Sequence, residues 1–147
     1  MEGPVVLDTS VIIKWFRQGE ILARPALALR HAYLTGRISI TLPSLLAYGL
    51  ANVLRYKADL STEQVQAAVR SRFDMQMRWM LHAVGVMEEA VEMARGYDTT
   101  VYDATFAALA GALEATFVTA DERLVRKLDA FPYVRFLGEL ERESKLE

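Results

Sequence analysis

The chain has 147 residues, of which 52% are hydrophobic and 24% are charged, and its formal net charge is -2. This composition is typical of one globular domain and excludes a disordered chain, while a local basic patch for nucleic acid stays compatible with the small net charge. The absence of cysteine excludes disulfides, zinc–thiolate sites and a cysteine nucleophile, so a metal site would use carboxylates or the two histidines, His31 and His82.

Short apolar runs alternate with amphipathic stretches along the whole chain. In order, the predicted elements are strand 4–8, helix 10–16, helix 21–34, strand 38–42, helix 43–56, helix 62–73, strand 79–84, helix 87–95, helix 100–113, strand 115–120, helix 121–128 and strand 133–137. The strands are continuously apolar, as in a sheet that is covered on both faces. Strands that alternate with helices predict an α/β fold with a mostly parallel sheet of about five strands.

Two helix starts carry recognisable signals. Pro43 fits the first turn of helix 43–56, where a missing N–H has no cost. Ser61, followed by Glu63 and Gln64, is typical of a capped start for helix 62–73.

The N-terminal segment MEGPVVLDTS has no basic stretch followed by a long apolar one, and no apolar run approaches the ~18 residues that span a bilayer. We therefore expect a cytoplasmic protein with no membrane segment. No internal repeat or linker divides the sequence. We expect one domain over residues 1–140, followed by a charged, frayed tail over residues 141–147, ERESKLE.

Three aspartates stand at positions where a parallel sheet binds ligands. Asp8 ends the first strand and Asp121 follows a later one, so both should emerge at the same edge of the sheet. Asp103 lies in the first turn of helix 100–113, on an apolar face that it shares with Phe106 and Ala107. A carboxylate on such a face is costly unless it is paired, hydrogen-bonded or bound to a metal ion.

Each aspartate also has a purely structural interpretation. Asp8 and Asp121 can initiate turns or cap the helices that follow them, and Asp103 suits the third position of a helix that Thr100 caps. Taken singly, Asp8 and Asp121 favour this interpretation. Together, the three carboxylates at one edge favour a hard divalent cation, Mg²⁺ or Mn²⁺, and the hydrolysis of a phosphodiester.

The order and spacing of four segments resemble PIN-domain proteins and, in size, the VapC toxins of toxin–antitoxin pairs. These segments are VVLDTSVIIKWF, LPSLLAYGLANVLRY, YDTTVYDATFAALAGAL and TFVTADERLVRKL, and the resemblance covers nearly the whole chain. It implies a three-layer α/β/α sandwich and a metal-dependent endoribonuclease that acts on RNA. It also implies a homodimer and a VapB-like antitoxin as partner.

The resemblance also implies roles for individual residues. Asp8, Asp103 and Asp121 take the places of three acidic residues that bind Mg²⁺ or Mn²⁺ and support catalysis. The hydroxyls of Ser10 and Thr119 can help to hold the first acidic group or a metal-bound water.

One acidic position of the family pattern is missing. The family has a glutamate three residues before an asparagine, which here is Asn52, and the glutamate's position is Gly49. A helical wheel places Gly49 between Leu45 and Val53, near the centre of the apolar stripe of helix 43–56. Close approach of that helix to the sheet would explain a glycine there, and the same geometry would direct a glutamate toward a metal ion.

Gly49 leaves three interpretations open. Another carboxylate, Asp98 or Glu122, replaces the glutamate; or one metal ion on three aspartates supports slow hydrolysis; or the site is degenerate and the protein binds RNA or an antitoxin without cutting. We favour the second and third equally over the first.

Other side chains have both a functional and a structural interpretation. Phosphate-binding candidates near the site are Lys14, Arg17, Arg55 and Lys57. Aromatic residues that can stack bases are Trp15, Phe16, Tyr48 and Tyr56. For each of them, a solvated helix face, a core position or a dimer contact is the more common outcome. Neither histidine has a partner at metal-ligand spacing, and no glycine-rich phosphate loop follows the first strand, which disfavours a nucleotide-binding protein.

Overall fold

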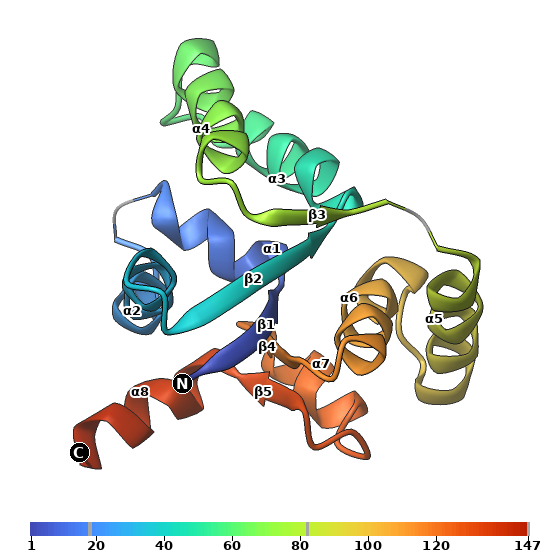
Figure 1. Ribbon diagram of the computed structural model, residues 1–147. Coiled ribbons are helices and arrows are strands. Elements are labelled where there is room, and N and C mark those ends of the chain that lie inside the picture. Colours follow the sequence, from blue (N-terminus) through green and yellow to red (C-terminus); the bar gives the residue numbers. More distant parts are fainter. Residues whose placement is uncertain (18, 82, 147) are drawn as a thin grey trace.

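Five parallel strands in the order β3-β2-β1-β4-β5 form the central sheet of the computed structural model (Figure 1), which describes residues 1–17, 19–81 and 83–146. The elements are β1 Gly3–Leu7, α1 Thr9–Ile12, the 3-10 helix η1 Ile13–Trp15, α2 Ala23–Leu34, β2 Ile38–Pro43, α3 Leu45–Arg55, α4 Thr62–Asp74, β3 Arg78–Met80, α5 Val84–Tyr97, α6 Val101–Ala112, β4 Thr116–Thr119, α7 Glu122–Lys127, β5 Val134–Phe136 and α8 Leu137–Leu146. This confirms the predicted α/β class and the parallel sheet.

β1 lies at the centre of the sheet and pairs with a strand on each side. Val5 is opposite Ile40 of β2 and Thr116 of β4, and Val6 and Leu7 are fully buried. A strand that lies between two neighbouring strands and under helices on both faces has no face in contact with solvent, which explains its continuous apolar sequence.

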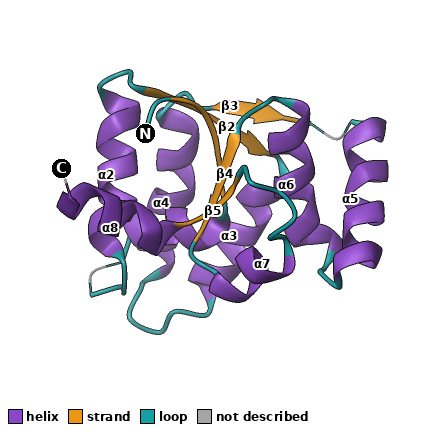
Figure 2. Ribbon diagram, turned by 90° about the horizontal axis from the view of Figure 1, so that it is seen from below, coloured by secondary structure: helices purple, strands orange, loops and turns teal. Residues whose placement is uncertain are grey.

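Helices cover both faces of the sheet, and the predicted sandwich is confirmed. α2 and α8 lie on one face, whereas α6 lies on the other with α5 stacked outside it (Figure 2). α6 approaches the strands closely because Ala104, Ala107 and Ala110, all fully buried, present only methyl groups. The hydroxyl of Thr100 accepts a hydrogen bond from the backbone N–H of Asp103 (3.0 Å), so the predicted cap of this helix is confirmed.

The predicted start of helix 43–56 is wrong by two residues. Pro43 is the last residue of β2, opposite Met80 of β3, and α3 begins at Leu45. The backbone N–H of Ser44 donates to the Met80 carbonyl (2.9 Å), so pairing with β3 continues past the proline. A strand end tolerates the missing N–H of proline as well as a first helical turn does, so the residue alone does not distinguish the two.

Two other predicted boundaries also change. The strand predicted over residues 79–84 is β3, which covers only Arg78–Met80, and α5 begins at Val84 rather than at residue 87. The position of His82 in that strand lies outside the described residues. The helix predicted over residues 10–16 consists of α1 and the 3-10 turn η1.

The C-terminal segment is helical where a frayed tail was expected. α8 begins at Leu137, which is fully buried, and continues through Leu146. Arg135 on β5 forms ion pairs with Glu139 and Glu143, in the first and second turns of this helix. In the part of the chain described here, no helix has the combination of length and apolar character needed to cross a bilayer.

α4 is capped as predicted and carries an unexpected buried cation. Ser61 and Gln64 form a reciprocal capping box, with hydrogen bonds of 2.7 and 3.1 Å. Arg72, near the other end, is fully buried, and its guanidinium lies 4.9 Å from the Trp15 ring centroid and 5.3 Å from that of Phe16. The apolar interior therefore encloses a charged group, which the sequence pattern did not indicate.

Candidate active site

Asp8 stands at the carboxyl end of β1 and is held by two hydroxyl groups. Its Oδ2 accepts hydrogen bonds from Thr119 Oγ1 (2.7 Å) and from Ser10 Oγ (2.9 Å). These hydroxyls in turn accept hydrogen bonds from the backbone N–H groups of Asp121 and Ala120, each at 3.0 Å. The contacts fix the hydrogen-bonding direction of both hydroxyls and therefore the orientation of the carboxylate.

Burial dominates the electrostatics of Asp8. Only 8% of the residue is exposed, and this desolvation raises the pKa of its carboxyl group. The hydrogen bonds from Thr119 and Ser10 oppose that shift, and the negative charge of Asp103 adds to it. Asp8 is thus a pre-oriented carboxylate whose ionised form would be favoured by a nearby cation.

Asp103 occupies the third position of α6 and lies near Asp8. It is half-buried, and burial is again the main cause of its raised pKa. The hydrogen bond with Thr100 lowers this pKa, and the charge of Asp121 raises it. Asp103 and Phe106 both line the pocket next to Asp8, so the helix face named in the sequence analysis does point toward the site.

Asp121 takes the structural role that was the alternative in the sequence analysis. It is the N-cap of α7, and its Oδ1 accepts a hydrogen bond from the Leu124 backbone N–H (3.2 Å). The residue is exposed and does not line the pocket that contains the other two aspartates. Within the described ranges, no three acidic or histidine side chains form a group that could hold a metal ion. The structure therefore brings two aspartates together and leaves the third beside them.

An open pocket of about 730 Å³ lies over the two aspartates. Asp8 and Thr9 come from the end of β1 and the start of α1, one wall comes from α3, and the other comes from α6. A volume in this range is typical of a site for a small ligand or for one unit of a polymer.

Gly49 lies on the wall of this pocket and not in the core. The buried stripe of α3 consists of Leu46, Leu50 and Leu54, whereas Gly49 is half-buried on the neighbouring face. A Cβ atom added at Gly49 would have one close neighbour, Thr9 Oγ1, at 3.4 Å. The wheel position between Leu45 and Val53 was right, but the interpretation of that stripe as core packing was wrong.

Asn52 and Arg55 line the same pocket from α3. Arg55 also lies over the ring of Tyr56, with its Cζ atom 4.3 Å from the ring centroid. Lys14 and Arg17, by contrast, are engaged with acidic neighbours: Lys14 Nζ is 3.8 Å from Glu20, and Arg17 pairs with Glu20 and with Asp59. Of the cations predicted to hold phosphates, Arg55 is the one that the structure places in the pocket.

The aromatic candidates divide in the same way. Trp15 and Phe16 pack against the core, and the indole N–H of Trp15 donates to the Ala26 carbonyl (2.8 Å). Tyr48 lines the pocket and is 78% exposed.

Asp98 and Glu122 do not replace the missing glutamate. Asp98 ends α5 with a left-handed backbone conformation (φ 56°), and its carbonyl accepts a hydrogen bond from Lys127 (2.6 Å). Glu122 is exposed at the start of α7. Neither residue lines the pocket.

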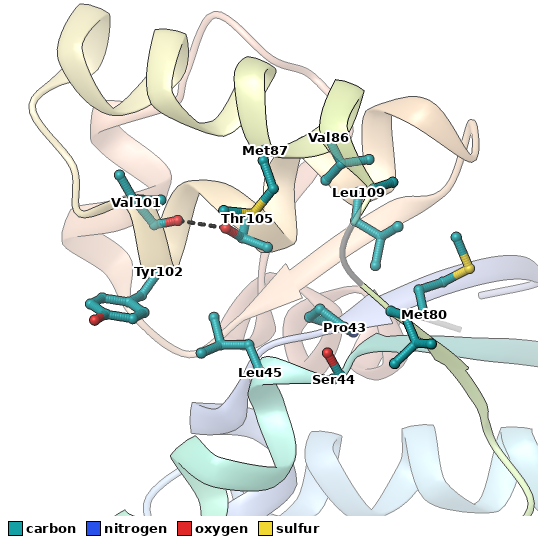
Figure 3. A pocket seen from close by; sticks show the side chains of 12 residues that line it. Pro43, Ser44, Leu45, Met80, Val86, Met87, Val101, Tyr102, Thr105 and Leu109 are labelled. Atoms are coloured by element: carbon teal, nitrogen blue, oxygen red, sulfur yellow. Dashed lines mark hydrogen bonds between the residues drawn. The ribbon is translucent and has the colours of Figure 1, made fainter.

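The sequence did not single out three pocket residues, Thr9, Ala51 and Tyr102. Tyr102 directly precedes Asp103, and that adjacency was the one available signal. Tyr102 and Leu45 also border a second, apolar pocket of about 210 Å³ between α3, α5 and α6 (Figure 3). The two pockets are therefore neighbours that share part of their walls.

Comparison with known families and structures identifies related proteins. A family model described as the PIN domain matches residues 5–129. No curated protein matches the sequence significantly. Among solved structures, PAE2754 from Pyrobaculum aerophilum is similar with a TM-score of 0.65 and 19% identity, over 99% of this chain and 98% of that one.

Two further structures share the fold. VapC20 from Mycobacterium tuberculosis, described as a sarcin-ricin loop cleaving toxin, has a TM-score of 0.67 and 16% identity, over 89% of this chain and 98% of its own. A toxin–antitoxin complex from Klebsiella pneumoniae has a TM-score of 0.65 and 16% identity, over 90% and 97%. At identities this low, the structural similarity shows a shared fold and nothing more.

Proposed function

The chain belongs to the PIN domain family, and from that premise we propose that it is a metal-dependent endoribonuclease of the VapC toxin type. The observation that carries the proposal is the pair Asp8 and Asp103, a buried and a half-buried carboxylate that line one open pocket, where the charge of Asp103 adds to the raised pKa of Asp8. Two ionised carboxylates in such a pair repel each other, and a bound divalent cation would offset that repulsion.

The donor chemistry of the pair fits Mg²⁺ or Mn²⁺. Mg²⁺ is commonly held by one or two carboxylates, with water and substrate phosphates completing its shell. Asp8 and Asp103 would supply those carboxylates, and Asp121, beside Asp103, would add negative charge at the outer edge. A cation bound there lowers the pKa of a coordinated water and neutralises charge on the phosphoryl group.

The residues around the pair have separate tasks. Ser10 and Thr119 orient the Asp8 carboxylate through their short hydrogen bonds. Arg55 offers a guanidinium for a substrate phosphate, and Asn52 offers both hydrogen-bond donors and an acceptor. Thr9 lines the same pocket, with its hydroxyl next to Gly49.

Cleavage of a hairpin RNA on a denaturing gel tests this proposal. We expect cleavage with Mg²⁺ or Mn²⁺, loss in chelator, and loss in Asp8→Asn and Asp103→Asn. Thr119→Val, which removes one hydroxyl from Asp8, should reduce the rate by about 10–100-fold. Asp59→Asn, an exposed acid outside the pocket, is the matched control and should cleave normally. Cleavage that persists in chelator or in Asp8→Asn would contradict the mechanism.

Gly49 supports a second candidate, a PIN domain that binds RNA or an antitoxin without cutting. The position faces the pocket, and no third acidic side chain of the described residues joins Asp8 and Asp103. The discriminating variant is Gly49→Glu, which has room to enter the pocket. An inert parent whose Gly49→Glu variant cleaves RNA with metal would establish the binding module, whereas a parent that already cleaves would exclude it.

We also propose a VapB-like antitoxin and a second copy of the chain as partners, and a cytoplasmic location. The toxin–antitoxin complex among the structures of similar fold supports an antitoxin. The apolar pocket and the exposed Leu81, Val84 and Tyr102 near it offer a surface for a protein partner. Light scattering of the purified chain, alone and with a co-expressed antitoxin, measures both associations.

A further inference from the structure

The guanidinium of Arg72 on α4 is surrounded by groups that accept hydrogen bonds poorly. Its Nη2 and Nη1 atoms lie 2.8 and 3.9 Å from the sulfurs of Met75 and Met77, and its Nε has no hydrogen-bond partner among the described residues. A thioether sulfur is only a weak acceptor. Within the described part of the chain, this fully buried cation therefore has neither an ion pair nor a hydrogen bond to an oxygen atom.

The other neighbours of Arg72 compensate only in part. Burial lowers the pKa of Arg72, and the positive charge of Arg30 on α2 lowers it further. The rings of Trp15 and Phe16, 4.9 and 5.3 Å from the guanidinium, supply cation–π contacts. An oxygen atom that carries negative charge would be a stronger partner, because a hydrogen bond from a cation to such an acceptor is among the strongest in proteins. A new oxygen acceptor beside Arg72 would therefore stabilise the fold.

Met75 is the sulfur-bearing neighbour of Arg72 that a small reagent in solvent can reach. It is half-buried, whereas Met77 is 4% exposed. Its backbone is fixed at the end of α4, because its N–H donates to the Ser71 carbonyl (3.1 Å) and its carbonyl accepts from the Tyr33 hydroxyl (2.6 Å). A chemical change at the sulfur would leave this backbone in place and alter what Arg72 contacts.

We propose that Met75 is an oxidation site, at which a peroxide converts the thioether to a sulfoxide that the Arg72 guanidinium binds. With hydrogen peroxide, a lone pair of the sulfur attacks one peroxide oxygen, and an S–O bond forms as the O–O bond breaks. The proton on the transferred oxygen passes to the departing hydroxide, which leaves as water. The sulfur is oxidised by two electrons and the peroxide is reduced by the same two.

The expected effect is the opposite of ordinary methionine oxidation. A sulfoxide usually disrupts a protein interior, because a polar group replaces an apolar one. At Met75 a donor is already in place, since the sulfoxide oxygen would stand one bond from the sulfur and within hydrogen-bond reach of Nη2. Oxidation should therefore hold the end of α4 more firmly against α2 and η1. This inference does not depend on the proposed nuclease function.

Glutamine at position 75 tests the pairing without any oxidant, because its side-chain carbonyl oxygen stands one bond beyond the place of the sulfur. We expect Met75→Gln to unfold about 2–8 °C above Met75→Leu, which keeps an apolar side chain. In chains that also carry Arg72→Met, the order should reverse, because the glutamine then has no cation to bind. If those double variants do not fold, the comparison of the two single variants still decides.

Hydrogen peroxide tests the modification itself on the full-length protein. After mild treatment, peptide mass spectrometry should find an added oxygen on Met75 and none on Met77. Oxidation should change the unfolding temperature of the parent more favourably than that of Met75→Leu, by about 2–8 °C. Met87→Leu is the matched control, because Met87 is 41% exposed and lines the apolar pocket away from Arg72. It should respond to peroxide at least as favourably as the parent.

The contrary outcomes are distinct. Met75 that stays unoxidised after Met87 has reacted would overturn the oxidation site. Met75→Gln that is no more stable than Met75→Leu, or an oxidised parent that responds as Met75→Leu does, would overturn the pairing with Arg72. An equal gain from glutamine with and without Arg72 would assign the effect to the glutamine itself and would also count against the proposal.

Discussion

Asp8 combines a fixed position with an unfavourable charge. Its pKa is raised mainly by burial, so the folded protein binds a proton at this residue more tightly than the unfolded chain does. The protonated fold is therefore favoured at low pH. As the pH rises above the ordinary aspartate value of 3.8, the folded state must ionise a desolvated group, and stability falls.

A first prediction follows for Asp8→Asn, the variant that removes the charge and keeps the shape. Without metal at pH 7 it should unfold at a higher temperature than the parent, and this advantage should vanish below about pH 4. Mg²⁺ should stabilise the parent and not the variant, because only the parent has both carboxylates. Thermal unfolding across pH measures this, with Asp74→Asn, an exposed acid outside the pocket, as the control. A variant less stable than the parent at pH 7 would show that the hydroxyl contacts of Asp8 outweigh its burial.

At the residue scale, the sequence predicted which residues lie at the edge of the sheet better than it predicted what those residues contact. The aspartates at strand ends were found because parallel strands present their carboxyl ends at one edge. The capping role of Asp121 and its absence from the pocket were not predicted. An aspartate that caps a helix and an aspartate that binds a metal ion can stand at the same position of the sequence. Tyr102 escaped notice because its one local signal, its position next to Asp103, does not distinguish an exposed helical tyrosine from a buried one.

Among the elements, α3 shows why helical periodicity alone does not locate a binding site. It has a buried stripe of Leu46, Leu50 and Leu54 and, rotated by one residue, a stripe through Leu45 and Gly49 that lines the pocket. Both stripes have helical spacing and both are apolar. The 3.6-residue period locates an apolar face but does not say whether the sheet or a cavity lies opposite.

α4 raises a different question, because its buried Arg72 forms no ion pair with a carboxylate in the part of the chain that the structure describes. Its Nη2 lies 2.8 Å from Met75 Sδ, and its Nε has no hydrogen-bond partner among the described residues. Burial, aided by the positive charge of Arg30, lowers the pKa of Arg72 to about 10. The rings of Trp15 and Phe16 compensate for part of the desolvation.

We predict that the length of Arg72 matters more than its charge. Arg72→Met keeps an extended chain between the rings and removes a desolvated cation, so it should be at least as stable as the parent in urea. Arg72→Ala leaves a cavity and should be less stable than Arg72→Met by about 2–5 kcal/mol. Equal destabilisation by both substitutions would mean that the guanidinium contacts themselves hold α4 in place.

For the whole molecule, the alternation of strands and helices predicted the class, the parallel sheet and its cover on both faces. It did not predict the order β3-β2-β1-β4-β5, because pairing depends on which apolar strands meet in space. Nor did it predict α8. The charges of the last residues suggested a solvated tail, but they form a helix that starts from a buried leucine and packs near α2.

Truncation tests how much of this C-terminal helix belongs to the domain. A chain that ends after Leu140 loses the exposed contact between Arg135 and Glu143, which should cost less than about 1 kcal/mol. A chain that ends after Phe136 also loses the buried Leu137 and should cost about 2–5 kcal/mol. Urea unfolding of both chains measures the difference. Equal and large losses would place the domain boundary beyond residue 140, whereas equal and small losses would place it before Leu137.

The hydrogen bond between Thr119 and Asp8 has a consequence for the order of events during synthesis, because it joins residues 111 positions apart. β1 leaves the ribosome first, yet its partner β4 and the hydroxyl that orients Asp8 follow only 111 positions later, and at about 5–20 residues per second this is a wait of many seconds. Pairing at such separation is also slow once the chain is complete. A nascent chain that ends before β4 therefore contains Asp8 and Asp103 but lacks the strand and the Thr119 hydroxyl that hold Asp8 in place.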